Sequence, residues 1–280
     1  MRATFRAVLI AAALCGGAVD AEARSLDAVK SGGVLRVTVY RDYKPWSWEE
    51  KGVLKGIDVD IGAALAKQLG VKVDYLVLRA DDNINDDLRN GVWRGSLVGE
   101  QPGDVMLHVP NDPLVETAND KIKLTAPYQV ESLAMAVEPG KADRAEDFSL
   151  FETEKVAVVG ATLSDIILLS VRDHKLIPNV VHMRGEDKAA EAFEKGDVVA
   201  FYGESALVEN LASQSGKPVT IVFPKYRLVQ KWPIGGAVQA SAVDLADAID
   251  KEIAGLSASG ELNRIFTAYG VKWRQPKEEQ

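Results

Sequence analysis

The residues best suited to ligand chemistry are the aromatic side chains of the segment from Tyr43 to Trp48. This segment directly follows the apolar run from Val34 to Tyr40, which has the composition of a buried strand. Ligands of open α/β sheets bind beyond the carboxyl ends of the strands. Tyr43, Trp46 and Trp48 therefore predict a platform on which a ligand stacks; the alternative is a hydrophobic plug between the loop and the sheet.

Three polar residues stand near other predicted strand ends. Glu204 follows the strand from Val198 to Tyr202 and is either a ligand carboxylate in a cleft or a helix-start residue that favours the helix dipole. His108 ends the run from Asp104 to Val109 and is either a cleft residue or a histidine of the core or its rim. Asn111 lies just beyond this strand and completes the set of candidates.

The sequence gives little support for a metal site or an enzyme. His174 and His182 are eight residues apart, with no third ligand in helical register. The acidic cluster from Asp81 to Asp87 lacks the central glycine of a calcium loop, and Val92 stands where a bidentate glutamate is required. The motifs G-x-S-x-G, H-E-x-x-H and the P-loop do not occur in the sequence. We expect no metal, no cofactor and no catalytic activity.

Composition narrows the classes of partner. The chain has 280 residues, of which 47% are hydrophobic, so it can bury a sizeable core. Its 41 acidic and 33 basic residues give a formal charge of −8. This charge argues against nucleic acid and anionic membranes as partners and leaves cationic or neutral ones open.

Residues 1–23 are predicted to be a cleavable signal peptide. Arg2 and Arg6 form its basic start, an apolar stretch too short to span a bilayer follows, and Ala21-Glu22-Ala23 is the cleavage site. The single cysteine, Cys15, lies in this segment after Leu14, which argues against a lipid anchor. We expect a periplasmic, monomeric protein without thiols or a membrane anchor.

The segment after the candidate platform is predicted to form the helix and strand that hold the platform in place. Apolar residues recur every four positions from Ile57 to Leu69, which indicates an amphipathic helix with Asp58 as its N-terminal cap and Gly70 at its end. The apolar run from Val71 to Leu78 then completes a parallel β-α-β unit.

Strand and helix patterns alternate along most of the chain and predict two α/β lobes. Lobe one takes residues 25–131 and 231–273, lobe two takes residues 132–230, and residues 274–280 form a charged tail. Two crossings between the lobes make a hinge, and the cleft between the lobes is the natural ligand site.

Several motifs resemble those of the type II periplasmic solute-binding proteins across essentially the whole mature sequence. They are D-Y-x-P-W-x-W, G-I-D-V-D-I and the C-terminal SGELNRIFTAYGVKW. The resemblance implies the α/β fold of that class, with two lobes joined by a two-crossing hinge. The stretch NDDLRNGVWRGSLVGEQPGDVMLHVPNDP is more similar to the MxaJ/XoxJ type. That type implies an accessory of a PQQ-dependent methanol dehydrogenase, in the lanthanide-dependent form for XoxJ.

The resemblance also assigns binding residues. Amino-acid-binding members carry an acid and an aromatic residue at the positions of Tyr40 and Tyr43, so the aromatic is kept and the acid is lost. Their arginine for the ligand carboxylate has no counterpart in HVPNDPLVETANDKIKL. Gly160 and Thr162 match the G-x-T turn that binds an anion, and Glu204 matches the aspartate that holds the ligand amine.

Three functions follow from this reading. The main one is an accessory that supports the dehydrogenase, with its cytochrome c as a further candidate partner, through contacts at Val92 to Gly103 and Pro110 to Lys123. The first alternative is a substrate-binding protein of an ABC transporter for a small polar solute such as an amino acid. The second alternative is an enzyme like cyclohexadienyl dehydratase, in which Glu204 acts as general acid or base.

Overall fold

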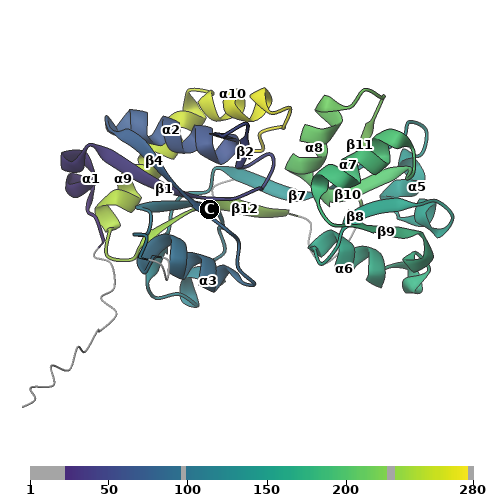
Figure 1. Ribbon diagram of the computed structural model, residues 1–280, viewed down its shortest axis with the longest axis horizontal. Coiled ribbons are helices and arrows are strands. Elements are labelled where there is room, and N and C mark those ends of the chain that lie inside the picture. Colours follow the sequence, from purple (N-terminus) through teal and green to yellow (C-terminus); the bar gives the residue numbers. More distant parts are fainter. Residues whose placement is uncertain (1–22, 96–98, 226–230, 277–280) are drawn as a thin grey trace, which may run out of the picture.

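The computed structural model describes residues 23–95, 99–225 and 231–276, and Figure 1 shows two α/β lobes joined by two long strands. This arrangement confirms the predicted fold class. All but the last residue of the predicted signal peptide lie outside the described residues. Within the described part of the chain, no helix is both long and apolar enough to cross a membrane.

Lobe one is built on the predicted β-α-β unit. Strand β1 (Val34–Tyr40) pairs in parallel with β4 (Lys72–Leu78) on one side and with β5 (Val105–Pro110) on the other, and α2 (Ile57–Leu69) makes the crossover. Gly70 ends α2 in the left-handed conformation, as the sequence predicts.

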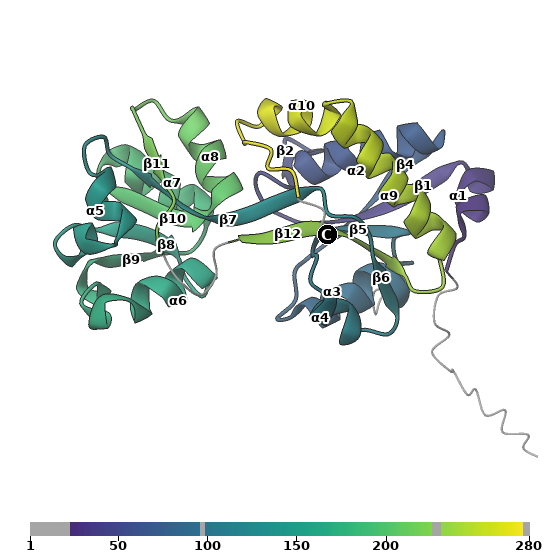
Figure 2. The same ribbon diagram turned by 180° about the vertical axis from the view of Figure 1, so that it is seen from behind.

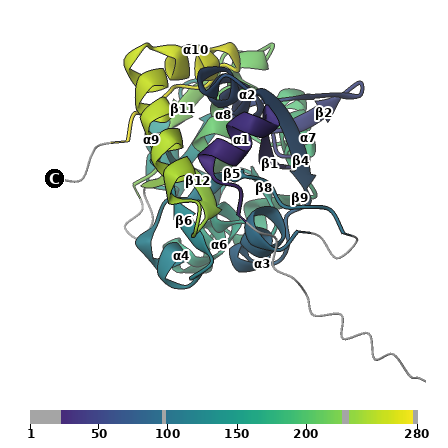
Figure 3. The same cartoon turned by 90° about the vertical axis from the view of Figure 1, so that its left-hand side faces the viewer.

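Helices cover both faces of the lobe-one sheet, and Figure 3 shows the two layers from that end of the molecule. The core between the sheet and the first layer is the largest apolar cluster of the described residues. The first layer contains α1 (Leu26–Gly32), α2, α9 (Val243–Ala258) and α10 (Glu261–Ala268); the second contains α3 (Ile84–Leu88), a π-helical turn (Arg89–Trp93) and α4 (Pro113–Thr117).

The predicted cap of α2 is wrong. Gly56, at φ 138°, precedes the helix, and the side chain of Asp58 makes no cap bond. The loop before α2 folds back so that the amides of Ile57 and Asp58 donate to the carbonyls of Pro45 and Trp46, at 3.0 and 2.9 Å. These carbonyls accept hydrogen bonds from amides of the first helical turn. The Asp58 carboxylate is therefore not needed as a cap and can form hydrogen bonds in the core.

The segment from Pro110 to Lys123, one of the two predicted contact segments, contains two short elements. Asp112 caps α4 and Pro113 occupies its first turn. Strand β6 (Ile122–Leu124) then pairs with the second crossing strand. A small hairpin of β2 (Trp48–Glu50) and β3 (Val53–Lys55) precedes α2.

The two crossings are β7 (Gln129–Val137) and β12 (Lys231–Gln239), seen side by side in Figure 2. They pair antiparallel from Ile234 opposite Gln129 to Lys231 opposite Ser132. Strand β12 also pairs with β5 of lobe one, and β7 also pairs with β10 of lobe two. A ten-stranded sheet therefore runs through the hinge in the order β4-β1-β5-β12-β7-β10-β8-β9, with β6 paired to β12 and β11 paired to β7.

Lobe two buries both faces of its part of the sheet, and the alternation along β7 shows why. Leu133, Met135 and Val137 face one core, whereas Ala134 and Ala136 face the other. The strands are β8 (Val156–Val159), β9 (Val180–Met183), β10 (Ala200–Glu204) and β11 (Thr220–Val222); the helices are α5 (Ala142–Glu146), α6 (Leu163–Ser170), α7 (Glu186–Lys195) and α8 (Ser205–Gln214), with 3₁₀ turns at Ser149–Glu152, Arg172–His174 and Ile177–Asn179.

Candidate functional site

A cavity of about 500 Å³ lies between the lobes at the carboxyl end of β1. Tyr43, Glu204 and Trp232 line it and also line a second cavity of about 400 Å³ that extends over lobe two. The other residues around the first cavity are Tyr40, Arg41, Asp42, Ala80, Asp81, Asp82, Asn83, Ile84, Asp87, His108, Pro110 and Ile234. The space is therefore bounded by both lobes and by the second crossing strand.

Direct contacts join the lobes across this space. The Tyr43 hydroxyl donates to Glu204 Oε2 at 2.7 Å, and Lys44 Nζ lies 3.1 Å from Asp187 Oδ1 on α7. Burial raises the pKa of Tyr43 well above its ordinary value, and the charge of Glu204 acts in the same direction. The phenol therefore stays protonated and remains a donor throughout the physiological pH range.

The lobe-one wall is aromatic. The ring of Tyr43 meets His108 edge-on at 4.8 Å and Tyr40 at 6.0 Å between centroids. The Tyr40 hydroxyl donates to Asp87 Oδ2 at 2.7 Å. His108 has a φ of 62°, a left-handed turn of the backbone inside β5, at the bulge where Leu107 pairs with Gly236 and Val109 with Gly235. This turn lets the imidazole sit beside Tyr43 at the edge of the cavity.

A buried polar network supports this wall from behind. Tyr128 donates to Asp58 Oδ1 at 2.7 Å and accepts from the His108 amide at 2.9 Å, while His108 Nδ1 lies 3.3 Å from Asp58 Oδ2. Trp46 is fully buried and packs on His108 at 4.4 Å between ring centroids. Trp46 lines neither cavity.

The electrostatics of the first cavity favour a cation. Five carboxylates line it, those of Asp42, Asp81, Asp82, Asp87 and Glu204. Burial is the main cause that raises the pKa of Asp87 above its ordinary value. The single guanidinium on this wall belongs to Arg41, which is exposed and makes no ion pair with the described residues.

The predicted anion turn of lobe two is satisfied internally. Thr162 caps α6, and its hydroxyl donates to the Val159 carbonyl at 2.7 Å. Asp165 Oδ2 accepts the Ala161 amide at 2.9 Å, and its other oxygen lies 2.8 Å from His182 Nε2. A carboxylate of the protein thus occupies an anion position at this turn. Thr162 lines the second cavity, whereas Gly160 lines neither.

Asn111 also lies away from both cavities, because its side-chain amide donates to the Thr125 carbonyl at 2.7 Å. The structure therefore brings Tyr40, Tyr43, His108 and Glu204 together at one cavity. Sequence reasoning missed Arg41, Asp42 and Trp232. The first two stand between Tyr40 and Tyr43, so the strand-end rule could have found them, but the position of Trp232 depends on the hinge pairing.

No group of three or more possible metal ligands occurs among the residues that the structure describes. The expectation of no metal site and no cofactor stays a prediction.

Comparison with solved structures identifies the fold. An ancestral cationic amino acid solute-binding protein superimposes on 87% of this chain and 98% of its own length, with a TM-score of 0.69 and 23% identity. The chain therefore has the type II periplasmic-binding-protein fold. Residues 35–93, which hold most of β1, the aromatic loop and α2, match the bacterial extracellular solute-binding proteins, family 3.

Two curated proteins are similar in sequence. A probable histidine-binding protein of Neisseria gonorrhoeae is 22% identical over 94% of this chain and 92% of that protein. Cyclohexadienyl dehydratase of Pseudomonas aeruginosa is 39% identical over 69 residues, which are 24% of this chain and only 26% of the enzyme.

Proposed function

We propose that this protein is an extracytoplasmic solute-binding protein that captures a small cationic or zwitterionic solute of the amino-acid class for an ABC transporter. The observation that carries the proposal is the cavity bounded by Tyr43 of lobe one and Glu204 of lobe two, with five carboxylates on its wall. Relatives named for cationic amino acid and histidine binding support the same class of ligand.

Each part of such a solute has a partner at this site. An ammonium or guanidinium group can pair with the carboxylate of Glu204 beside the ring of Tyr43, where cation–π attraction and charge act together. A ligand carboxylate fits Arg41, whose guanidinium can bind it with two parallel hydrogen bonds. Arg41 thus supplies the cation that the sequence lacks after β5.

A thermal-shift panel tests the proposal, since a ligand that binds only the folded chain raises the melting temperature. The panel contains the twenty amino acids and the amines derived from arginine, lysine and histidine. We expect the largest shifts from cationic amino acids, and we expect Tyr43→Ala to abolish them. Preference for acidic amino acids, or equal shifts with Tyr43→Ala, would contradict the assignment of this cavity.

A second candidate is the dehydrogenase accessory that the MxaJ/XoxJ resemblance implies. One observation favours it: Leu114, on α4 within a predicted contact segment, is 73% exposed. Under this hypothesis the purified protein raises the activity of a PQQ-dependent methanol dehydrogenase and co-purifies with it, and Leu114→Ser weakens both effects. The hypothesis fails if neither effect is measurable.

A third candidate is an enzyme, supported by the 69-residue similarity to cyclohexadienyl dehydratase. Glu204 would then act as general acid or base in a dehydration that forms an aromatic ring. Turnover of a cyclohexadienyl acid is followed by the ultraviolet absorbance of the aromatic product. Activity that is lost in Glu204→Gln would favour this candidate over solute capture.

A further inference from the structure

Helix α8 belongs to lobe two by connectivity but is shared between the two cores. Leu207 and Val208 pack in the lobe-two cluster that contains Phe193. Ala206 is fully buried in the lobe-one cluster that contains Tyr128. Successive residues of a helix point about 100° apart, so neighbouring positions can serve different cores. The orientation of α8 therefore depends on both lobes.

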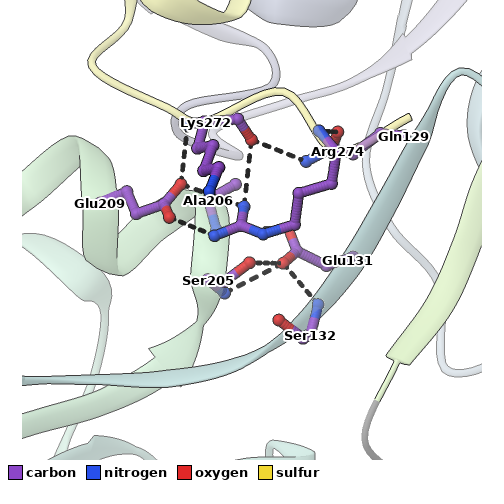
Figure 4. Close-up of polar contacts among 8 residues, drawn as sticks. All are labelled: Gln129, Glu131, Ser132, Ser205, Ala206, Glu209, Lys272 and Arg274. Atoms are coloured by element: carbon purple, nitrogen blue, oxygen red, sulfur yellow. Dashed lines mark hydrogen bonds and ion pairs between the residues drawn. The ribbon is translucent and has the colours of Figure 1, made fainter. Parts of the chain in front are cut away.

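The first crossing strand holds the N-terminus of α8. The carboxylate of Glu131 on β7 accepts the amide of Ser205 at 3.0 Å, the amide of Ala206 at 3.3 Å and the hydroxyl of Ser205 (Figure 4). Free amides at a helix start attract a carboxylate, and this one is fully buried. The hinge strand thus fixes the start of the helix, directly after Glu204.

The C-terminal segment holds the same helix one turn later. Glu209 accepts the Lys272 amide at 2.9 Å and both terminal nitrogens of Arg274 (Figure 4). The side chains of Glu209 and Arg274 are 8% and 17% exposed. The pair is therefore a largely buried, two-point contact between lobe two and the end of the chain.

Two more contacts extend this attachment along α8. Asn210 donates to the Tyr269 carbonyl at 2.8 Å. A Cβ added to Gly270 would lie 2.1 Å from Ser213 Oγ, so the backbone of the C-terminal segment runs directly against the helix. Arg274 was predicted to begin a charged tail, but its carbonyl accepts the Val130 amide of β7 at 2.9 Å. The segment therefore links α8 to the hinge.

We propose that Glu209 and Arg274 are positioning residues for the ligand site: by holding α8 against the C-terminal segment, they fix Glu204 opposite Tyr43. Neither residue lines the two cavities that hold Glu204. Glu204 is the last residue of β10 and directly precedes α8, whereas Glu209 lies in the second turn of that helix, so the position of the helix couples the two residues. This inference rests on the proposed function of the cleft as a ligand site.

The physical reason is the cost of leaving a buried charge unpaired. Without Arg274, the Glu209 carboxylate keeps only the Lys272 amide as a partner in the C-terminal segment, and the weakened attachment lets α8 move away from that segment. Such a movement displaces Glu204, which directly precedes α8. Ligand affinity should fall although every group that touches the ligand is intact.

The experiment uses the full chain and compares Arg274→Gln, Glu209→Gln and the conservative Arg274→Lys. The control is Arg264→Gln, which breaks the Arg264–Glu261 ion pair on the exposed side of α10. Affinity is measured calorimetrically for the amino acid with the largest thermal shift. Spin labels at Lys67 and Lys188, both exposed and in different lobes, report the inter-lobe distance in a Cys15→Ser background.

We expect Arg274→Gln and Glu209→Gln to weaken binding about tenfold and to broaden the inter-lobe distance distribution. Arg274→Lys should recover part of both effects, and Arg264→Gln should change neither. A lower melting temperature with unchanged affinity and distances would overturn the inference, because it would show a purely structural pair. If the wild type binds no solute, the proposed function fails, and an unchanged distance distribution in the variants would separately overturn the positioning role.

Discussion

Tyr43 and Glu204 are joined by a 2.7 Å hydrogen bond, although they lie 161 positions apart and in different lobes. The phenol comes from the loop after β1, and the carboxylate comes from the end of β10. The bond closes one side of the candidate ligand cavity with atoms of the protein itself. It links two candidate binding residues to the relative position of the lobes.

The first prediction concerns this bond. Tyr43→Phe removes the hydroxyl and keeps the ring, so the ligand-free protein loses a hydrogen bond to a charged group, about 1.5–3 kcal/mol. We expect a more open average conformation, measured as a larger radius of gyration in small-angle scattering. Tyr75→Phe is the control, because that hydroxyl donates to the Val59 carbonyl and does not line the cavity. Identical scattering from both variants would contradict the prediction.

The second prediction concerns Arg41. If its guanidinium binds the ligand carboxylate, the wild type should prefer L-arginine over agmatine, which lacks that group, by about ten- to a hundredfold. Arg41→Gln should remove most of this preference by weakening only the amino acid. Titration calorimetry with both ligands measures it. Arg79→Gln, an exposed arginine outside the cavity lining, should leave the preference intact. A preference that survives Arg41→Gln would assign the carboxylate to other groups.

The third prediction concerns pH. Burial raises the pKa of Glu131 from 4.5 to about 7, and the charge of Glu204 acts in the same direction, while hydrogen bonds from Ser205 and Ser132 oppose the shift. Between these two pH values the folded chain keeps a proton that the unfolded chain has lost. The free energy of unfolding should therefore fall as pH rises from about 4.5 to about 7, by at most about 1.4 kcal/mol per pH unit from this group.

Urea unfolding at several pH values in this window measures the effect. Glu131→Gln should flatten the dependence, because the amide does not titrate there. The exposed Glu116 on α4 provides the control variant Glu116→Gln, which should preserve the wild-type dependence. Equal pH dependence of the wild type and Glu131→Gln would rule out Glu131 as its source.

The fourth prediction concerns the backbone of His108. Its φ of 62° is easy for glycine and strained for alanine, and both substitutions remove the ring. We expect His108→Gly to be more stable than His108→Ala by about 1 kcal/mol, from denaturant unfolding. The neighbouring Val109 has no positive φ, so Val109→Gly should be the less stable of its own pair. The same order at both positions would refute the argument from strain.

Local pattern was enough to predict the β-α-β unit. The bounds of β1 match the predicted strand, and α2 ends at Gly70 as expected, because apolar periodicity and a left-handed C-cap are properties of short segments. The alternation of strands and helices likewise predicted the two lobes. The fold class could therefore be predicted from local sequence patterns alone, without knowledge of any tertiary contact.

The site was predictable only in part. Tyr43 and Glu204 lie where strand ends and the family resemblance place them. Asp58 has the composition of a helix cap, yet its role depends on Tyr128, 70 positions away, and on loop carbonyls that already satisfy the helix. The contribution of Trp232 depends in the same way on pairing with β7. Contacts of this kind arise from tertiary packing and leave no local pattern.

The pairing of β7 with β12 determines how lobe two is inserted into the chain. The chain departs from lobe one and comes back through adjacent strands, with Ser132 directly opposite Lys231. Lobe two is thus an insertion between two paired antiparallel strands of lobe one. A tight turn that joined Ser132 to Lys231 would delete lobe two and leave the paired strands in register. Another domain could be inserted between the same two positions.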